Sequence, residues 1–163
     1  MTSDFFDLLK RLSNTGVDFV IVGGFAGIVH GCTYVTQDID ICCDFSPANL
    51  LRLQKALVGL HPVHRATPNR LKLHLTEDNC RQFNNLYLDT DIGQLDCLNF
   101  ISGIGDFQTV KKKSVLAKIE NIQLRVLNLD SLIEAKKAMN RPRDREAVLE
   151  LEAIKKLKKE SKK

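Results

Sequence analysis

The spacing of hydrophobic residues predicts an amphipathic helix near the start of the chain. Four residues follow the i, i+3, i+4, i+7 pattern that places side chains on one helix face: Phe5, Leu8, Leu9 and Leu12. Thr2 and Ser3 are candidate caps before this helix, and Gly16 is a stop signal after it. The first element is therefore predicted to be a helix with one apolar face.

The next segment is predicted to run from a strand through a tight turn and a short helix into a second strand. Residues 17–22 are apolar and mostly β-branched or aromatic, which is typical of a strand. Gly23-Gly24 then permits a tight turn, and the apolar residues 25–30 form a short helix that ends at Gly31. Residues 38–43 alternate carboxylates with isoleucines before two cysteines, which predicts a strand with one buried face.

The middle of the chain is predicted to hold one helix and two further strands. Ser46 is a good helix cap with Pro47 at the first helical position. The helix has an apolar stripe made of Leu50, Leu53, Leu57 and Leu60. Residues 71–75 and 93–101 are both predicted to be strands, and the polar stretch 76–90 between them is left unassigned.

The end of the chain is predicted to be mainly helical. A short strand over residues 122–127 precedes a helix that Asn128 or Asp130 can cap. Pro142 interrupts this helix, and a final helix begins at about Arg143. The buried residues of the final helix are expected to be Val148, Leu151, Ile154 and, at its end, Leu157.

These elements predict an α/β (α+β) fold with a small mixed β-sheet, flanking helices and a helical C-terminal end. The 163 residues fit one domain over 1–163, with a core at about 1–127 and C-terminal helices at about 128–160. No apolar run is long enough to span a bilayer and no secretory signal is visible, so we expect a cytoplasmic protein that does not enter membranes. The five cysteines, an odd number that includes the adjacent pair Cys42-Cys43, are expected to be buried thiols.

The net charge of +4 conceals two basic clusters. One covers residues 111–113, and the other consists of Lys155, Lys156, Lys158, Lys159, Lys162 and Lys163. A lysine-rich terminus is usually a solvated helix end, and the alternative is contact with phosphate groups. Charge alone does not decide between these interpretations. The two basic clusters slightly favour RNA as a partner, but no aromatic stacking pattern accompanies them.

Two carboxylates in the second predicted strand form a candidate metal site. Successive strand side chains point to opposite faces, so Asp38 and Asp40 lie on one face while Ile39 and Ile41 enter the core. Two close carboxylates repel each other, and a divalent cation between them makes the arrangement favourable. The simpler alternative is that they form the polar face of an edge strand. The Gly23-Gly24 turn upstream can bind an anion through free backbone amides, which favours the metal interpretation.

This combination resembles the polymerase-β-like nucleotidyltransferases, whose motif is an apolar strand, Gly-Gly or Gly-Ser, a spacer and Asp-x-Asp. The matching residues are Val20 to Gly24 and Asp38 to Ile41. The sequence around Thr36 is most similar to that of a small bacterial branch with abortive-infection and toxin-type members. The resemblance implies that Gly23, Gly24 and Thr36 contact the nucleotide. Gly24 departs from the many relatives that carry serine and thus removes one hydroxyl contact.

The same resemblance implies a third carboxylate on a neighbouring strand, and Asp96 in an apolar strand is the best match. Asp96 would orient or deprotonate the attacking hydroxyl, and Asp38, Asp40 and Asp96 would together bind Mg²⁺ or Mn²⁺. A strand-end Asp bonded to a turn is the alternative interpretation of Asp96. Asp89 and Asp91 are poorer candidates because they precede Gly93 in a loop-like stretch.

The C-terminal segment also resembles this branch, in which a lysine is followed five residues later by Arg-Pro-x-Asp. The matching residues are Lys136, Arg141, Pro142 and Asp144. Lys136 would reach a triphosphate, and Asp144 would hold Arg141 or the next helix in place. Ala147 departs from the acidic residue that relatives carry there.

The expected function is transfer of a nucleoside monophosphate from an NTP to a hydroxyl of a macromolecule, either RNA such as tRNA or a protein. The alternative is a non-catalytic module with the same fold, acting through a partner protein as a toxin-antitoxin or regulatory component. A small-molecule acceptor such as an antibiotic is a third possibility. It is disfavoured because its pocket usually needs extra helices that this short chain lacks.

Overall fold

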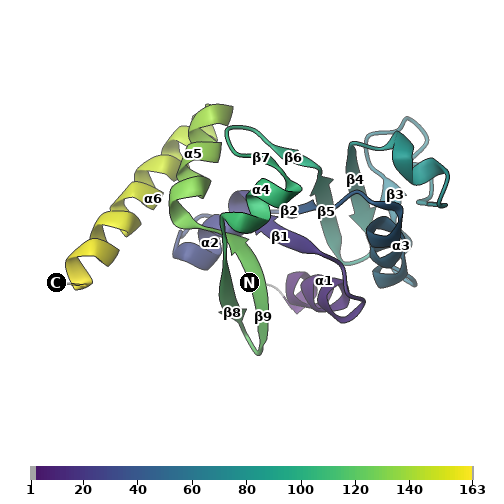
Figure 1. The fold of residues 1–163 in the computed structure, drawn as a ribbon, viewed down its shortest axis with the longest axis horizontal. Coiled ribbons are helices and arrows are strands. Elements are labelled where there is room, and N and C mark those ends of the chain that lie inside the picture. Colours follow the sequence, from purple (N-terminus) through teal and green to yellow (C-terminus); the bar gives the residue numbers. More distant parts are fainter. Residues whose placement is uncertain (1–2, 163) are drawn as a thin grey trace.

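The computed structural model describes residues 3–162 and contains a seven-stranded mixed sheet in the order β3-β4-β5-β2-β1-β9-β8 (Figure 1). Thr2, a candidate cap, and Lys163 of the basic cluster lie outside the described residues. The strands of this sheet are β1 (Phe19–Val22), β2 (Asp38–Cys43), β3 (Val63–His64), β4 (Asn85–Thr90), β5 (Gly93–Leu98), β8 (Ser114–Ile119) and β9 (Ile122–Leu127). The pairs β2–β5 and β1–β9 are parallel, and the other neighbours are antiparallel.

Six α-helices accompany the sheet within the described residues. They are α1 (Ser3–Asn14), α2 (Gly23–His30), α3 (Pro47–Ala56), α4 (Phe107–Lys112), α5 (Leu129–Met139) and α6 (Pro142–Ser161). A short 3₁₀ helix, η1 (Asn79–Gln82), and a two-stranded ribbon of β6 (Phe100–Ile101) and β7 (Gly105–Asp106) complete the fold. The mixed sheet, the flanking helices and the helical C-terminal end confirm the predicted fold class. None of the helices within residues 3–162 combines the length and apolarity needed to cross a bilayer.

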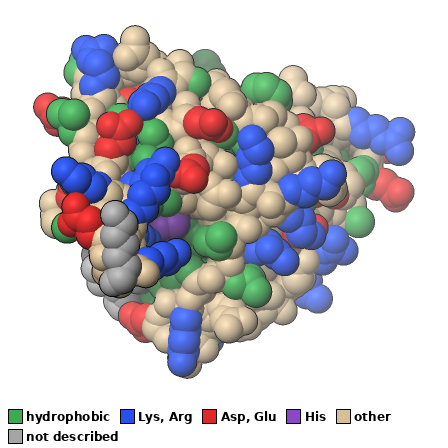
Figure 2. All heavy atoms as spheres, turned by 60° about the vertical axis from the view of Figure 1, so that its left-hand side comes forward, with side chains coloured by type: hydrophobic (Ala, Val, Ile, Leu, Met, Phe, Trp, Pro, Cys, Tyr) green, Lys and Arg blue, Asp and Glu red, His purple; other side chains and the backbone are tan. Residues whose placement is uncertain are grey.

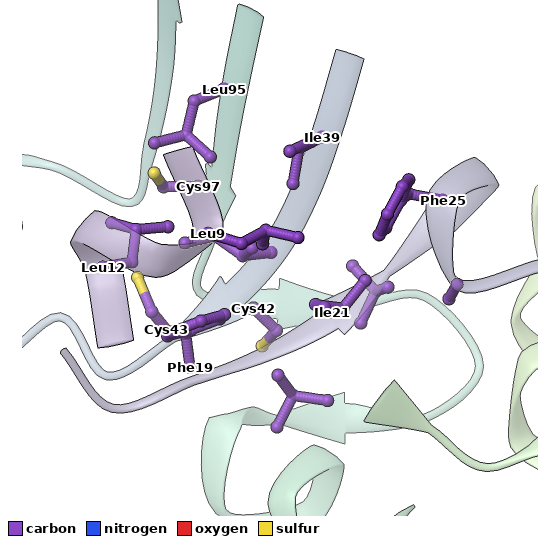
Figure 3. Packing of buried hydrophobic residues seen from close by; sticks show 14 of the residues in the cluster. Leu9, Leu12, Phe19, Ile21, Phe25, Ile39, Cys42, Cys43, Leu95 and Cys97 are labelled. Atoms are coloured by element: carbon purple, nitrogen blue, oxygen red, sulfur yellow. The ribbon is translucent and has the colours of Figure 1, made fainter. Parts of the chain in front are cut away.

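One face of the central strands carries the hydrophobic core. Leu9 and Leu12 of α1 pack on this face against Ile39, Leu95 and Cys97 (Figure 3). All five side chains are fully buried, and α1 also contacts α3 on the same side. Because strand side chains alternate, the residues between these core positions in β2 and β5 point to the opposite face. The polar residues of both strands are thereby placed together on that second face.

The helix pair α5–α6 lies at one end of the molecule, and β3 with η1 lies at the other (Figure 1). Both helices of the pair contact α2. Asn128 caps α5 by accepting a hydrogen bond from the Ser131 amide (2.8 Å), which resolves the choice between Asn128 and Asp130. Asp144 accepts from the Arg141 amide (3.1 Å) in a capping box at the start of α6. These caps fix where the C-terminal helices begin beside α2.

The structure corrects two of the predicted strands. Residues 71–75 do not form a strand. They make a single β-bridge, between Lys72 and Val63, and the Leu75 amide donates to the Gln54 side chain instead of to a neighbouring strand. The predicted strand over 93–101 is interrupted after Leu98, where β5 ends and the chain leaves for the separate β6–β7 ribbon. Apolar residues at both places favour a strand, but they do not predict which backbone partner is available.

Six elements were not predicted: β3, η1, β4, β7, α4 and β8. The unassigned stretch contains β4, in which Leu86 and Leu88 are buried and alternate with polar neighbours. The helix α4 is capped by Asp106, whose carboxylate accepts from the Thr109 amide (3.0 Å). The edge strand β8 has mostly exposed or half-buried side chains, so it lacks the alternation that marks a strand. In addition, α3 ends at Ala56, although Leu60 beyond it is buried as its predicted stripe requires. Leu157 in α6, which was expected to be buried, is exposed.

Candidate active site

Three carboxylates converge on the open face of the two central parallel strands. Asp38 and Asp40 come from β2 and Asp96 from β5, with Asp40 directly opposite Asp96 in the register. One carboxylate oxygen from each residue lies within 4.8 Å of the others. All three side chains are half-buried rather than fully exposed. The strand interpretation of Asp38 and Asp40 is therefore correct, and Asp96 joins them as the motif implied.

Gly23 is needed because the chain turns into α2 directly against this cluster. Its φ of +67° lies in the left-handed region, and a Cβ there would overlap the Oδ2 atom of Asp40. The preceding residue, Val22, offers no side-chain hydrogen bond to the first turn of α2. The first amides of α2 thus have no side-chain cap, and they begin next to Asp40. Free helix N-terminal amides favour an anionic ligand.

Residues that precede β2 hold the turn and the first carboxylate in place. The Tyr34 hydroxyl donates to the Gly24 carbonyl oxygen (3.0 Å), and the Thr36 hydroxyl donates to the Asp38 carbonyl oxygen (3.1 Å). A Cβ on Gly24 would lie only 3.1 Å from Thr36 Oγ1, so even alanine would crowd this contact. Glu150 accepts from both the amide and the hydroxyl of Thr33 (2.7 Å each), which links this segment to α6.

The C-terminal helices supply a buried cation to the same region. Lys136 on α5 has 9% relative exposure, and its Nζ lies 3.7 Å from Oδ1 of the fully buried Asp144. Asp144 also accepts two hydrogen bonds from the Arg141 guanidinium (2.6 and 3.2 Å). The role expected for Asp144, holding Arg141 at the start of the next helix, is therefore seen directly. Two cations share one carboxylate, so part of their positive charge is available to a ligand.

A cleft of about 790 Å³ brings these features together. All of the predicted site residues line it: Gly23, Gly24, Thr36, Asp38, Asp40, Asp96 and Lys136. Its other charged residues are Arg141, Arg143, Asp144, Glu146 and Glu150. Carboxylates therefore outnumber cations in the lining, and the excess negative charge lies on the strand side and on α6. A volume of this order accommodates a ligand the size of a nucleotide.

Burial and mutual repulsion among the carboxylates dominate the electrostatics of the cluster. Burial and the neighbouring Asp38 and Asp96 raise the pKa of Asp40 to about 7. Burial also raises the pKa of Asp96, although the Arg65 guanidinium opposes this shift. Burial lowers the pKa of Lys136, and the carboxylates of Asp144 and Asp40 counteract it. Three carboxylate donors that repel one another suit Mg²⁺ or Mn²⁺, which prefer oxygen ligands.

The raised pKa of Asp40 predicts a pH-dependent effect of neutralising it. Folding raises this pKa from its ordinary value of 3.8, so the folded state loses stability as the pH rises from about 4 to about 7. We expect Asp40→Asn in EDTA to have a higher melting temperature than the unmodified chain at pH 8, with the difference shrinking towards pH 5. Thermal melts at both pH values check this.

The matched control for these melts is Asp78→Asn, which removes an exposed carboxylate that makes no capping hydrogen bond to η1. This control should change little at either pH. Adding Mn²⁺ should stabilise the unmodified chain but not Asp40→Asn, because a ligand stabilises only the state that binds it. A melting temperature for Asp40→Asn that is lower by the same amount at both pH values would contradict the raised pKa.

Other residues singled out from the sequence have structural contacts. Asp89 is on β4 rather than in a loop and lies 2.5 Å from an Arg70 nitrogen. Asp91 lies in the following turn, where it bonds His61 (2.6 Å). A ring nitrogen of His30 is 2.8 Å from the Leu127 carbonyl oxygen, so His30 links the end of α2 to the end of β9.

Several residues that line the cleft were missed, among them Tyr34, Glu146 and Glu150. Two more lie beside Asp96. Arg65 follows β3, and its Nη2 donates to Asp96 Oδ1 (2.5 Å). Tyr87 on β4 lies opposite Asp96 in the register and lines the cleft. Both depend on β3–β4–β5 pairing, which the polar stretch 76–90 did not reveal. The alternation around Leu86 and Leu88 was the signal that could have placed Tyr87.

The fold of the chain is similar to the folds of solved structures, although its sequence as a whole is not similar to that of a known family. No family model matches the chain, and no curated protein matches it with significant similarity. A proposed nucleotidyltransferase from Thermotoga maritima is 17% identical, with a TM-score of 0.52 and coverage of 97% of this chain and 88% of that one. The lincosamide antibiotic adenylyltransferase LnuA, solved with lincomycin bound, is 13% identical, with a TM-score of 0.62 and coverage of 94% and 98%.

These likenesses show that the chain has the nucleotidyltransferase fold. The motif resemblance to the polymerase-β-like superfamily and the observed architecture therefore agree. The similarity to LnuA extends over nearly all of both chains.

Proposed function

We propose that this chain is an enzyme that transfers a nucleoside monophosphate from an NTP to an acceptor hydroxyl and releases pyrophosphate. The observation that carries the proposal is the convergence of Asp38, Asp40 and Asp96 within 4.8 Å, beside the uncapped first turn of α2. The carboxylate cluster suits divalent cations, and the first turn of α2 suits the phosphate groups that such cations accompany. Both nucleotide and metal can therefore bind in one cleft.

The three carboxylates are proposed to hold Mg²⁺ or Mn²⁺. They fit such a cation because burial and the neighbouring Asp38 and Asp96 raise the pKa of Asp40, and a bound divalent ion would favour its charged form. When bound, divalent ions in a site of this kind stabilise the attacking and leaving oxygens of a phosphoryl displacement. Asp38 and Asp40 share one strand face, so they would act as a pair, with Asp96 completing the set from β5.

The remaining site residues are proposed to bind and orient the NTP. The amides at Gly23 and Gly24 face the phosphates, and Thr36 keeps Asp38 in position. Lys136 adds positive charge from α5. Asp96 accepts the proton of the acceptor hydroxyl or orients that hydroxyl toward the α-phosphate. The proton leaves the hydroxyl, a new P–O bond forms and the bond to pyrophosphate breaks.

A macromolecular acceptor, either RNA such as tRNA or a protein, is the first candidate. Support comes from basic segments outside the cleft at residues 111–113 and 155–162. Two of these lysines are paired, since Lys111 lies 2.9 Å from Asp18 and Lys155 lies 2.8 Å from Asp130. Acidic and basic side chains are interspersed on the face toward the C-terminal helices, which leaves the lysines there without a continuous basic surface (Figure 2). The basic segments therefore support RNA only modestly.

A small-molecule acceptor is the second candidate, favoured by one specific observation. The absence of extra helices counted against it in the sequence, yet this chain covers 98% of LnuA, an antibiotic adenylyltransferase. Chain length thus does not exclude an antibiotic-sized acceptor. The excess of carboxylates in the cleft, including Glu146 and Glu150, also suits a neutral or cationic acceptor better than a polyanion.

A non-catalytic role, as a toxin-antitoxin or regulatory component that binds a partner protein, is the competing function. It predicts that the catalytic carboxylates can be lost or separated without cost. Asp38, Asp40 and Asp96 are instead all present and converge in the cleft. We therefore rank the enzyme first.

Incubation with each α-³²P-labelled NTP, Mg²⁺ and a cell extract tests the acceptor. We expect label in one fraction after separation of RNA, protein and small molecules, and none with Asp40→Ala. Label that RNase removes identifies RNA, label in a protein band identifies protein, and label in the small-molecule fraction identifies the second candidate. Absence of label with every NTP, together with co-purification of a specific partner, would replace the enzyme by the binding module.

A further inference from the structure

Arg65 makes an ion pair with a carboxylate that the proposed reaction needs free. Its Nη2 lies 2.5 Å from Oδ1 of Asp96, and both side chains are largely buried, with 26% and 13% exposure. Buried ion pairs of this kind are strong only when the geometry is fixed and the remaining donors are satisfied. The contacts around Arg65 therefore decide whether it merely neutralises Asp96 or holds it in one orientation.

The guanidinium is held on three sides besides Asp96. Its Nη1 donates to the Leu88 carbonyl oxygen (3.1 Å) and lies 3.5 Å from Asp89 Oδ1. That Asp89 oxygen is buried and accepts no hydrogen bond within the described residues, so the Arg65 charge is its compensation. The group also lies over the Tyr87 ring, 5.9 Å from its centre. Every contact comes from β4, the strand next to Asp96.

We propose that Arg65 is a positioning residue for the transfer reaction: it fixes Asp96 through Oδ1, so that Oδ2 is the oxygen presented to the cation and the acceptor hydroxyl. This inference rests on the proposed function. Its structural basis is the fixed orientation of the guanidinium group, because one of its nitrogens binds the backbone of β4 while the other binds Asp96. A planar guanidinium can serve both partners at once, whereas a lysine can serve only one.

The simpler explanation is that Arg65 only ties the 63–72 segment to the sheet. Arg70 provides a matched control, because it comes from the same segment and makes an equally short bond, 2.5 Å, to Asp89. Asp89 is not part of the carboxylate cluster. A purely structural role predicts similar consequences for Arg65→Gln and Arg70→Gln.

The test compares kcat and NTP KM for the two variants, using transfer of α-³²P label into the acceptor fraction. We expect Arg65→Gln to lower kcat by about tenfold or more with KM changed less than about threefold, the pattern of an interaction used in the transition state. Arg65→Lys should recover part of the loss. Arg70→Gln should stay within about twofold of the unmodified chain in both constants, as expected for a surface substitution.

A double variant separates positioning from folding. If Arg65 acts through Asp96, Arg65→Gln should cause little further loss in an Asp96→Asn background, because the two residues form one unit. Multiplicative losses in the double variant, or equal kcat losses for Arg65→Gln and Arg70→Gln, would overturn the inference while leaving the proposed function intact. If the unmodified chain is inactive with every NTP, both the positioning role of Arg65 and the proposed function are contradicted.

Discussion

Replacing both strand carboxylates, as Asp38→Ala/Asp40→Ala, should abolish nucleotidyl transfer, with a loss on the order of 10³ or more. The two side chains share one face of β2 and supply two of the three donors in the proposed metal site. Removing them leaves Asp96 alone, which is too few oxygen ligands to hold a divalent ion against water. The rate of label transfer from α-³²P-labelled NTP measures the loss.

The fold of this variant should persist, because Ile39 and Ile41 provide the buried face of the strand and are unchanged. Circular dichroism and thermal melting check this. A matched control is Asp78→Ala, which removes an exposed carboxylate that is outside the cluster. Transfer by the double variant at more than a tenth of the unmodified rate would argue against a metal site at these residues.

Asp96→Asn should lower kcat by on the order of 10² or more while the affinity for NTP changes little, as expected when a general base is lost. The amide has nearly the shape of the carboxylate but cannot take a proton from a hydroxyl. It also keeps an oxygen that can accept from Arg65, which now holds Oδ1 at 2.5 Å. Steady-state kinetics over a range of NTP concentrations separate the two constants.

Asp96→Glu is the companion variant, because it restores a carboxylate in a displaced position. It should retain more activity than Asp96→Asn if proton removal matters, and no more if only shape matters. Full activity in Asp96→Asn would exclude this residue from the chemistry. It would then leave Asp96 with only its ion pair to Arg65.

The centre of the site was predictable from the sequence because it depends on local patterns. The alternation around Asp38 and Asp40 places both on one strand face, and Gly23 is required where the chain turns against Asp40. Asp96 needed the family resemblance, since an acidic residue in an apolar strand has several explanations. The register that sets it opposite Asp40 is visible only in the folded sheet.

The surroundings of the site were not predictable, because they depend on partners distant in the sequence. Arg65 and Asp96 are 31 residues apart, and they meet only after β3, β4 and β5 have paired. The strand β4 is hidden in a polar stretch because only Leu86 and Leu88 of its side chains are buried. Residues 71–75 were wrongly predicted to be a strand: of their three leucines only Leu75 is buried, and the segment makes a single bridge, between Lys72 and Val63.

Calorimetric titration with Mn²⁺ in the presence of NTP tests the central claim most directly, because it requires no knowledge of the acceptor. The claim is that Asp38, Asp40 and Asp96 form a divalent-metal site beside a nucleotide-binding turn. We expect saturable Mn²⁺ binding to the unmodified chain and none to folded Asp38→Ala/Asp40→Ala. Equal binding by the two proteins would contradict the metal site and, with it, the proposed transfer reaction.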